Sequence, residues 1–332
     1  MPDTGPDVAP TERPPAEPKR VEGPALPAVE MHLHPPGNPG IGRVVSTDIC
    51  TDRKAAGFVR HVAIDVSGTD LAGRFRAGQS FGVIPPGTDP KGKPHRLRLY
   101  SIASPTAGED GTGNILATTV KRTIDEHWDD HSLFLGVASN YLCDLKVGDE
   151  VTVTGPNGKR FLLPEDPHAH DYVFFATGTG IAPFRGMILD LAAAGYTGTC
   201  HLIMGSPYAT DLLYHEELLR LADEHDFFHY TTAISRERQE DGSDPMYVQD
   251  RLQTHRDQLV AALSSERGLV YVCGIAGMEM GILQRLAQVL PAEHLDQYLQ
   301  IDPEVASDIR SWNRKMLHKQ LKTTRRVFLE VY

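Results

Sequence analysis

Between about residue 40 and residue 165, short apolar runs alternate with turn residues. Five such runs are rich in β-branched residues and bounded by Gly, Pro or Asp: GFVRHVAIDV, QSFGVIPPG, RLRLYSIAS, NILATTVKR and DEVTVTGPNG. Short strands separated by turn signals are typical of antiparallel sheets that close on themselves. The pattern predicts an antiparallel β-barrel domain over residues 40–165.

After residue 166, apolar strands alternate with helical segments. The strand YVFFAT leads into the turn GTGIAP, and FRGMILDLAAAG is typical of a helix with Gly195 at its end. Three further strands are expected at CHLIMGS, FFHYTTAIS and GLVYVCG, with helices at LLYHEELLRLADEH and GMEMGILQRLAQVL. Strand–helix alternation indicates a doubly wound parallel sheet, whose ligands bind beyond the carboxyl ends of the strands. We expect this α/β domain over residues 166–332.

The C-terminal pattern predicts one long helix and one last strand. Asp302 is a plausible N-cap and Pro303 suits the first helical position of DPEVASDIRSWNRKMLHKQLK. Its apolar stripe would consist of Val305, Ile309, Trp312, Met316, Leu317 and Leu321. The segment VFLEVY would then pair with the sheet edge and hold Tyr332 in place, the alternative being a frayed end.

Residues 1–39 are Pro-rich and polar, and we expect them to form an extended or disordered tail without chemistry. His32 and His34 are too few for a metal site, and we expect none. The formal net charge of -11 argues against a nucleic-acid partner. We see no secretory signal and no apolar run long enough to span a membrane.

The four cysteines lack C-x-x-C spacing, which argues against a disulfide scaffold, a zinc site or an iron–sulfur cluster. They fit reduced thiols in the cytoplasm.

Two motifs carry candidate chemistry. In ATGTGIAP, Gly178 and Gly180 lie between a strand and a helix, where a backbone can approach phosphate closely, although many such junctions are Gly-rich for packing alone. In RLYS, Arg98 and Tyr100 share one face of a strand. Arg can hold a diphosphate and Tyr can stack on a flat ring, but an ordinary exposed barrel face would look the same.

Taken together, the motifs resemble the plant-type ferredoxin–NADP reductases. RLYSIAS, GVASNYLCDL, ATGTGIAPFR, AISRE followed by MYVQ, VYVCGIAGME and the terminal LEVY occur in the order found in that family, over residues 40–332. The resemblance implies an FAD-binding barrel followed by an NADP-binding domain. It also implies hydride exchange between NADPH and FAD, and single-electron exchange with ferredoxin or flavodoxin.

Residue roles follow from the same resemblance. Arg98 would hold the FAD diphosphate within RLYS, Tyr100 would stack on the isoalloxazine beside Leu99, and Ser101 would hydrogen-bond near the reactive nitrogen. The diphosphate would also be bound by backbone and hydroxyl donors of Val137, Ala138 and Ser139. The family usually has Cys at the position of Ala138, a change that a backbone contact would survive.

On the nucleotide side, the resemblance assigns Thr177, Gly178, Thr179 and Gly180 to the nicotinamide and diphosphate path. Cys273, Gly274 and Glu330 would lie near the nicotinamide, with Cys273 shaping the pocket rather than acting as a nucleophile. Tyr332 would cover the flavin face where nicotinamide must sit. The implied catalytic residues are Ser101, Cys273, Glu330 and Tyr332.

The resemblance places Ser235 and Arg236 at the 2′-phosphate of NADP(H) and Tyr247 at its adenine. Pro245 stands where the family commonly has Lys, and Arg238 is the candidate substitute. Asp125 stands where the family has the aromatic residue that stacks on the FAD adenine. Trp128 is the candidate replacement.

The electron partner would need a basic surface, since ferredoxins are usually acidic. The candidate docking residues are Lys91, Lys93, Arg314, Lys315, Lys319 and Lys322, although the C-terminal ones could instead serve the end of the predicted helix. We expect a monomer that consumes NADPH. Two alternatives stay open: the reductase component of an oxygenase or epoxidase system, and a flavin-containing docking module without turnover.

Overall fold

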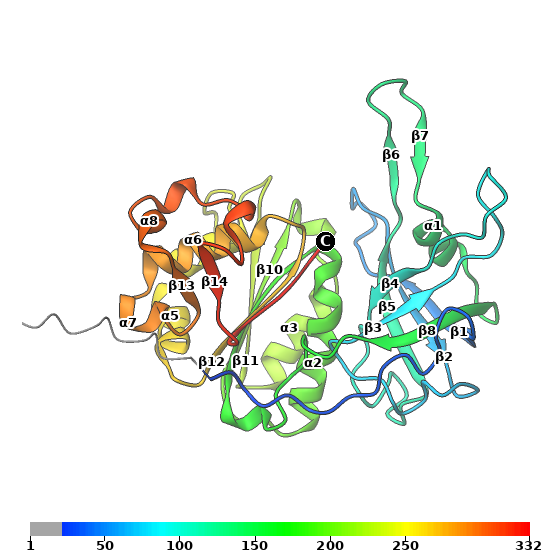
Figure 1. The fold of residues 1–332 in the computed structure, drawn as a ribbon, viewed down its shortest axis with the longest axis horizontal. Coiled ribbons are helices and arrows are strands. Elements are labelled where there is room, and N and C mark those ends of the chain that lie inside the picture. Colours follow the sequence, from blue (N-terminus) through cyan, green and yellow to red (C-terminus); the bar gives the residue numbers. More distant parts are fainter. Residues whose placement is uncertain (1–21) are drawn as a thin grey trace, which may run out of the picture.

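Two lobes, one built on an antiparallel sheet and the other on a parallel sheet, make up the fold (Figure 1). The structure is a computed structural model, and it describes residues 22–332. The described residues contain no helix that combines the length and apolar character of a membrane span.

The antiparallel lobe is an incomplete barrel of six strands in the order β4-β3-β8-β1-β2-β5. Their bounds are β1 Gly40–Ile49, β2 Val59–Asp65, β3 Ser80–Val83, β4 Arg98–Ser101, β5 Ile115–Lys121 and β8 Glu150–Asn157. The residues that follow β4 contact β5: Ile102 forms a bridge with Thr118, and the Ala103 N–H donates to the Ala117 carbonyl over 2.7 Å. This confirms the expected antiparallel sheet. The structure also contains β1, a strand for which no apolar run was predicted. The residues in the first half of β1 alternate between buried and exposed.

A hairpin and a helix lie between β5 and β8 in the chain. The hairpin pairs β6 Ile124–Glu126 with β7 Leu133–Leu135, and it projects away from both lobes (Figure 1). Helix α1, Val137–Asp144, begins two residues after β7 ends. The sequence pattern did not predict any of these three elements.

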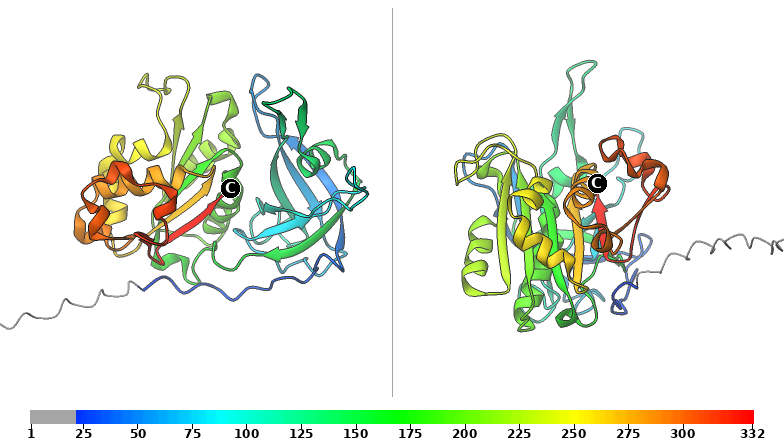
Figure 2. Two further views of the ribbon diagram at one scale, coloured as in Figure 1. Left: turned by 45° about the horizontal axis from the view of Figure 1, so that its top comes forward. Right: turned by 90° about the vertical axis from the view of Figure 1, so that its left-hand side faces the viewer.

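The parallel lobe carries five strands in the order β11-β10-β9-β12-β15, all parallel. Their bounds are β9 Asp171–Thr177, β10 Cys200–Ser206, β11 Phe228–Ile234, β12 Gly268–Gly274 and β15 Val327–Val331. The helices are α2 Ile181–Ala193, α3 His215–Glu224, α4 Arg251–Thr254, α5 Arg256–Ser264, α6 Met278–Val289 and α7 Ala292–Leu295. The expected doubly wound sheet is confirmed, and Figure 2 shows it between its two helix layers.

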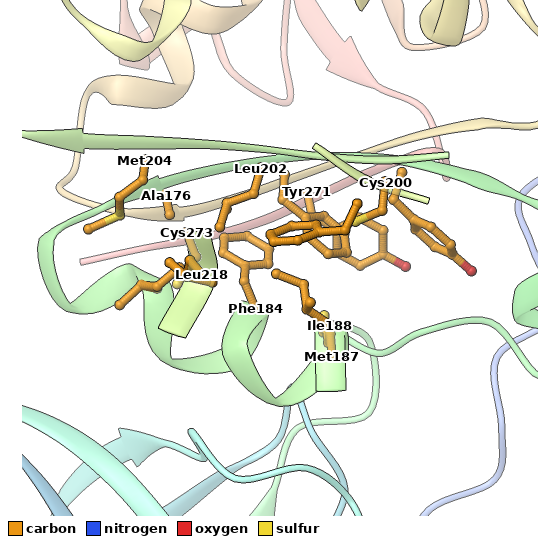
Figure 3. Packing of buried hydrophobic residues seen from close by; sticks show 14 of the residues in the cluster. Ala176, Phe184, Met187, Ile188, Cys200, Leu202, Met204, Leu218, Tyr271 and Cys273 are labelled. Carbon is orange, nitrogen blue, oxygen red and sulfur yellow. The ribbon is translucent and has the colours of Figure 1, made fainter. Parts of the chain in front are cut away.

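Alternation along β9 explains why helices cover both faces of this sheet. Tyr172 and Phe174 belong to the apolar cluster that contains α2 and α3, whereas Val173 and Phe175 belong to the cluster that contains α5 and α6. Successive side chains of a strand point to opposite faces of the sheet. A strand in which every residue is apolar must therefore be covered on both faces. Figure 3 shows the packing on the α2 side around Phe184 and Tyr271. The ring centres of Phe174 and Phe184 are stacked 4.7 Å apart.

The long C-terminal helix predicted from Asp302 is wrong beyond its first turn. Asp302 does cap a helix by accepting a hydrogen bond from the Glu304 N–H, but α8 spans only Pro303–Ala306. Polar side chains then bond to the nearby backbone, which favours turns over a continuous helix. The Ser311 hydroxyl donates to the Asp308 carbonyl, and the Asn313 side chain accepts from the Lys315 N–H.

The apolar residues of that segment are nevertheless buried or half-buried against the α6 side of the sheet. The segment ends in β14, Leu321–Thr323, which pairs with β13, Leu299–Ile301. The last strand of the chain, β15, forms as expected and extends the sheet beside β12.

Residues 22–39 form an extended strap along both lobes (Figures 1 and 2). Near its start Gly23 packs against Arg325, and further along the Ala25 carbonyl accepts from the Glu165 N–H. Glu30 pairs with Arg74 over 3.2 Å in the antiparallel lobe. The expectation of a disordered tail also covered residues 1–21, which lie outside the described residues.

Arg185 joins the two lobes. Its side chain is only 10% exposed on α2, and its nitrogens lie 2.7 Å from Glu109 of the antiparallel lobe and 2.8 Å from Glu217 of α3. It also donates to the Ala103 carbonyl. A buried cation between two carboxylates leaves both without compensation when it is removed.

We expect Arg185→Ala to destabilise the protein by about 3–5 kcal/mol, because Glu109 and Glu217 would then be half-buried beside each other without a cation. Urea unfolding of the purified full chain measures this cost. Arg43→Ala is the matched control, since Arg43 and Glu150 are 59% and 64% exposed and their pair contributes less than about 1 kcal/mol. Equal losses in the two variants would contradict a special role for Arg185.

Candidate functional site

The glycine-rich turn after β9 packs against the end of β12. Residues Gly178–Gly180 form the single 3-10 turn η2, which leads directly into α2. A Cβ on Gly180 would collide with the Cys273 carbonyl, so only glycine lets the two loops approach this closely. The Thr177 hydroxyl accepts from the Ile275 N–H at 3.0 Å and ties the loops together.

The end of the chain is held at the same place. The Tyr332 N–H donates to the Gly274 carbonyl, and its own carbonyl accepts from the Ala276 N–H, both over 3.0 Å. Its hydroxyl lies 2.6 Å from the Thr179 hydroxyl. Tyr332 is therefore fixed by backbone and side chain, while 63% of the residue remains exposed. In Figures 1 and 2 the terminus lies on the side that faces the antiparallel lobe.

Cys273 and Glu330 lie side by side in neighbouring strands behind Tyr332, since β12 and β15 pair them in register. Burial raises the pKa of the Cys273 thiol well above its ordinary value, so the group stays a thiol. Burial also raises the pKa of the Glu330 carboxyl to about 7. Among the described residues, Oε2 of Glu330 is buried without a hydrogen-bond partner.

A pocket of about 630 Å³ opens in front of these residues, and we call it the Tyr332 pocket. It brings together predicted residues from the ends of β9 and β11, the loop after β11 and the terminus: Thr177, Gly178, Thr179, Ser235, Tyr247 and Tyr332. Lys121, at the end of β5, lines it from the other lobe. The pocket thus lies where the two lobes meet.

A second pocket of about 680 Å³, the Tyr100 pocket, lies in the antiparallel lobe. Six residues predicted around the diphosphate and the ring line it: Arg98, Leu99, Tyr100, Val137, Ala138 and Ser139. The first turn of α1 contains no acidic residue and no side-chain cap. Its N–H groups, together with Arg98, therefore suit an anion.

One expected donor in this pocket is already engaged. The Ser139 hydroxyl donates to the Gly136 carbonyl and accepts from the Thr123 N–H, both at 3.2 Å. The backbone N–H of Ser139 is the donor that remains for a ligand.

Some predicted residues line neither pocket. Ser101 is half-buried at the end of β4, where its carbonyl accepts from the Thr118 hydroxyl. Gly180, Cys273, Gly274 and Glu330 lie just behind the Tyr332 pocket. The Arg236 guanidinium lies 5.9 Å from the ring centre of Tyr208, at the rim beside Ser235.

Arg238, the candidate substitute for a missing lysine, is occupied. It donates to the Gly242 carbonyl at 2.8 Å and lies 3.5 Å from the Asp244 carboxylate. Since these partners are exposed, a phosphate could still displace them.

Lys121 and Phe134 are among the residues that line these pockets and that sequence reasoning missed. The only signal for Lys121 was a cation at the end of a predicted strand. Phe134 lies in the unpredicted hairpin, and it lines the Tyr100 pocket where Trp128 does not. Among the described residues, no group of three or more His, Cys, Asp or Glu could hold a metal ion.

The candidate docking cations fall into two groups. Lys91 and Lys93 are exposed in the loop between β3 and β4, and Lys315, Lys319 and Lys322 are exposed in the C-terminal segment of the other lobe. Arg314 is paired at 2.7 Å with Glu279, which is 1% exposed. Its charge therefore serves a buried carboxylate of α6.

Comparison with known proteins agrees with both lobes. Residues 174–284 match the family described as "Oxidoreductase NAD-binding domain". The chain is 41% identical to a ferredoxin--NADP reductase of Spirulina sp over 260 residues, 76% of this chain and 87% of that protein. It is 36% identical to leaf isozyme 1 of Arabidopsis thaliana over 292 residues, 86% of this chain and 80% of that protein.

Solved structures show the same fold. The ferredoxin-NADP+ reductase of Plasmodium falciparum has a TM-score of 0.68 at 23% identity, covering 91% of this chain and 99% of that one. A structure of that protein with 2'P-AMP has a TM-score of 0.65 at 22% identity, covering 80% and 97%. The expected order of an antiparallel lobe followed by a parallel one is confirmed.

The raised pKa of Glu330 makes stability depend on pH. The folded state retains its proton up to about pH 7, whereas the unfolded carboxyl releases it near 4.5. This contribution to stability is complete below about pH 4.5 and is lost as pH rises through 7. Glu330→Gln cannot ionise, so its stability advantage over the wild type should grow by about 2 kcal/mol between pH 5 and pH 8.

Urea unfolding at the two pH values measures this difference. Glu304→Gln, on the exposed first turn of α8, is the control for the loss of a carboxylate from the same lobe. A Glu330→Gln advantage that does not change with pH would show that Glu330 ionises normally.

Proposed function

The chain belongs to the ferredoxin–NADP reductase family, and from this premise we propose that it exchanges hydride between NADPH and a bound FAD and passes single electrons to a ferredoxin. One observation carries the proposal. The loops after β9 and β12, the end of β15 and Lys121 of the other lobe line one pocket, so a nucleotide bound there would reach the junction with the flavin lobe.

The Tyr100 pocket fits FAD. Arg98 and the N–H groups of Val137–Ser139 would hold the diphosphate, and Tyr100 would pack against the isoalloxazine ring. Burial raises the pKa of Tyr100 to about 12, so the ring stays neutral at physiological pH. When bound, FAD supplies the conversion between a two-electron hydride and single electrons.

The Tyr332 pocket fits NADP(H). The turn Gly178–Gly180 and Lys121 would bind the diphosphate, and Ser235 with Arg236 would bind the 2′-phosphate. Tyr247 is 63% exposed and can stack on adenine. Arg238 is paired with the Asp244 carboxylate and is therefore not a free cation for the 2′-phosphate. We expect a moderate preference for NADPH over NADH for this reason.

We propose that Ser101 forms a hydrogen bond near the reactive nitrogen of the flavin and that Glu330 holds or releases a proton close to it. A carboxyl with a pKa near 7 can hold or release a proton at physiological pH. Cys273, as a buried thiol, would shape the nicotinamide site and form no covalent bond with substrate.

Tyr332 would act as a shutter over the flavin. Its backbone is fixed in the sheet, so only its side chain needs to turn away, after the bond to Thr179 breaks. A nucleotide that must displace this ring binds with reduced apparent affinity.

Other expectations stay predictions: an NADPH-consuming direction, flavodoxin as a second acceptor, a monomeric state and a cytoplasmic location. The four free cysteines are compatible with a reducing compartment. We also propose the domain boundaries 40–165 and 166–332.

Stopped-flow reduction of the purified yellow protein tests the function. NADPH should bleach the flavin much faster than NADH in the wild type. Arg236→Ala should weaken NADPH binding by about tenfold with little effect on NADH, because only NADPH carries the 2′-phosphate. Tyr332→Ser should strengthen the binding of both nucleotides alike, because the shutter covers the nicotinamide that they share.

Arg236→Ala and Tyr332→Ser are controls for each other, because the first should change the binding of NADPH alone and the second the binding of both nucleotides. A flavin that neither nucleotide reduces would end the reductase proposal. Equal effects of Arg236→Ala on NADPH and NADH would remove Arg236 from the 2′-phosphate site.

Ferredoxin docking is tested by salt. If Lys91, Lys93, Arg314, Lys315, Lys319 and Lys322 attract an acidic partner, electron transfer to a ferredoxin should slow roughly fivefold or more from low to high salt. The double variants Lys91→Glu/Lys93→Glu and Lys319→Glu/Lys322→Glu compare the two groups, with reduction by NADPH as the internal control. A group whose reversal leaves the transfer rate unchanged does not dock ferredoxin.

A further inference from the structure

The hairpin β6–β7 displays an aromatic side chain opposite Asp125. The register pairs Asp125 with Phe134, Ile124 with Leu135 and Glu126 with Leu133. Directly opposed residues of an antiparallel pair project from the same face. Phe134 is therefore on the face of Asp125, one strand across.

The base of the hairpin lines the Tyr100 pocket. Thr123, Phe134 and Leu135 line it, whereas Ile124, Glu126 and Leu133 do not. Phe134 is 48% exposed and belongs to none of the three apolar clusters of the described residues. Its exposed ring is a surface on which a flat group can stack.

The ring is oriented by a neighbour. His127 meets Phe134 edge-on, with ring centres 5.8 Å apart and planes at 85°. In this geometry His127 can cover at most one face of the phenyl ring, so the opposite face is not covered by it. Trp128, in contrast, is 94% exposed in the turn of the hairpin and does not line the pocket.

Chain connectivity sets the position of Phe134 relative to the diphosphate site. Gly136, the N-cap of α1, follows Phe134 by two residues, and the N–H groups of Val137–Ser139 come next. Arg98 and Tyr100 lie on β4 in the same pocket. A dinucleotide with its diphosphate at α1 and its isoalloxazine at Tyr100 would extend its adenosine half toward the hairpin.

We propose that Phe134 is the platform on which the adenine of FAD stacks, supplied by β7 where the family supplies an aromatic from β6. The proposal rests on the proposed function and replaces Trp128 in that role. It also makes Phe134 a determinant of FAD over FMN, because FMN lacks the adenylate half.

Flavin binding to the full chain, stripped of flavin and titrated with FAD or FMN, tests the proposal by fluorescence. Phe134→Ala should raise the Kd for FAD by about 10- to 100-fold, the range for losing one base–aromatic stack. The Kd for FMN should not change. Phe134→Tyr and Phe134→Trp retain a ring and should bind FAD as the wild type does.

ADP provides a second readout, as a competitor that carries the adenine and diphosphate without the isoalloxazine. Phe134→Ala should weaken its competition by the same factor as for FAD, and Trp128→Ala should leave both unchanged. Weakened FAD binding in Trp128→Ala alone would overturn the assignment. Equal losses for FAD and FMN in Phe134→Ala would also overturn it, since they would place the effect at the isoalloxazine or in the fold.

Failure of this proposal is distinguishable from failure of the proposed function. A wild-type chain that binds FAD and is reduced by NADPH, with normal FAD affinity in Phe134→Ala, would refute only the platform. A wild-type chain that binds no FAD would refute the proposed function itself.

Discussion

The ion pairs of Arg185 are the constraint on which the site depends. Arg185 lies one turn into the helix that follows the turn Gly178–Gly180, and Glu109 lies in the barrel lobe. The same side chain thus joins the helix that follows the glycine-rich turn to the lobe that carries Tyr100 and Lys121. Because a desolvated charge tolerates few geometries, the relative placement of the two pockets is set by electrostatics as well as by apolar packing.

The parallel sheet does the rest of the positioning. Parallel strands bring the carboxyl ends of β9, β12 and β15 to one edge of the sheet. The register of these strands alone places Thr177, Cys273 and Glu330 close together at that edge. The last strand turns a chain terminus, usually a mobile element, into part of the sheet. The backbone of Tyr332 is therefore held by Gly274 and Ala276, and its side chain by Thr179.

The sequence predicted most of this and missed what depends on register or on distant partners. Apolar runs such as YVFFAT identify strands in any context, and glycines at tight junctions mark the turns. The apolar residues after Asp302 are buried or half-buried as predicted, but the segment is not helical beyond its first turn, because the side chains of Ser311 and Asn313 form hydrogen bonds with the nearby backbone. Trp128 was the candidate from linear spacing, which does not reveal that Phe134 faces Asp125 across the hairpin. The sequence does not reveal that the side chain of Arg314 forms an ion pair with Glu279, because the two residues are brought together only by the fold.

The strap has a consequence for the order of assembly. Its first described residues pack on Arg325, so the contact joins two segments from opposite ends of the chain. During synthesis the antiparallel lobe can form while the parallel lobe is still emerging, since domains tend to fold as units from the N-terminus. The strap can dock fully only when the last strand has left the ribosome. The contact of Gly23 with Arg325 is therefore one of the last long-range contacts that the growing chain can form.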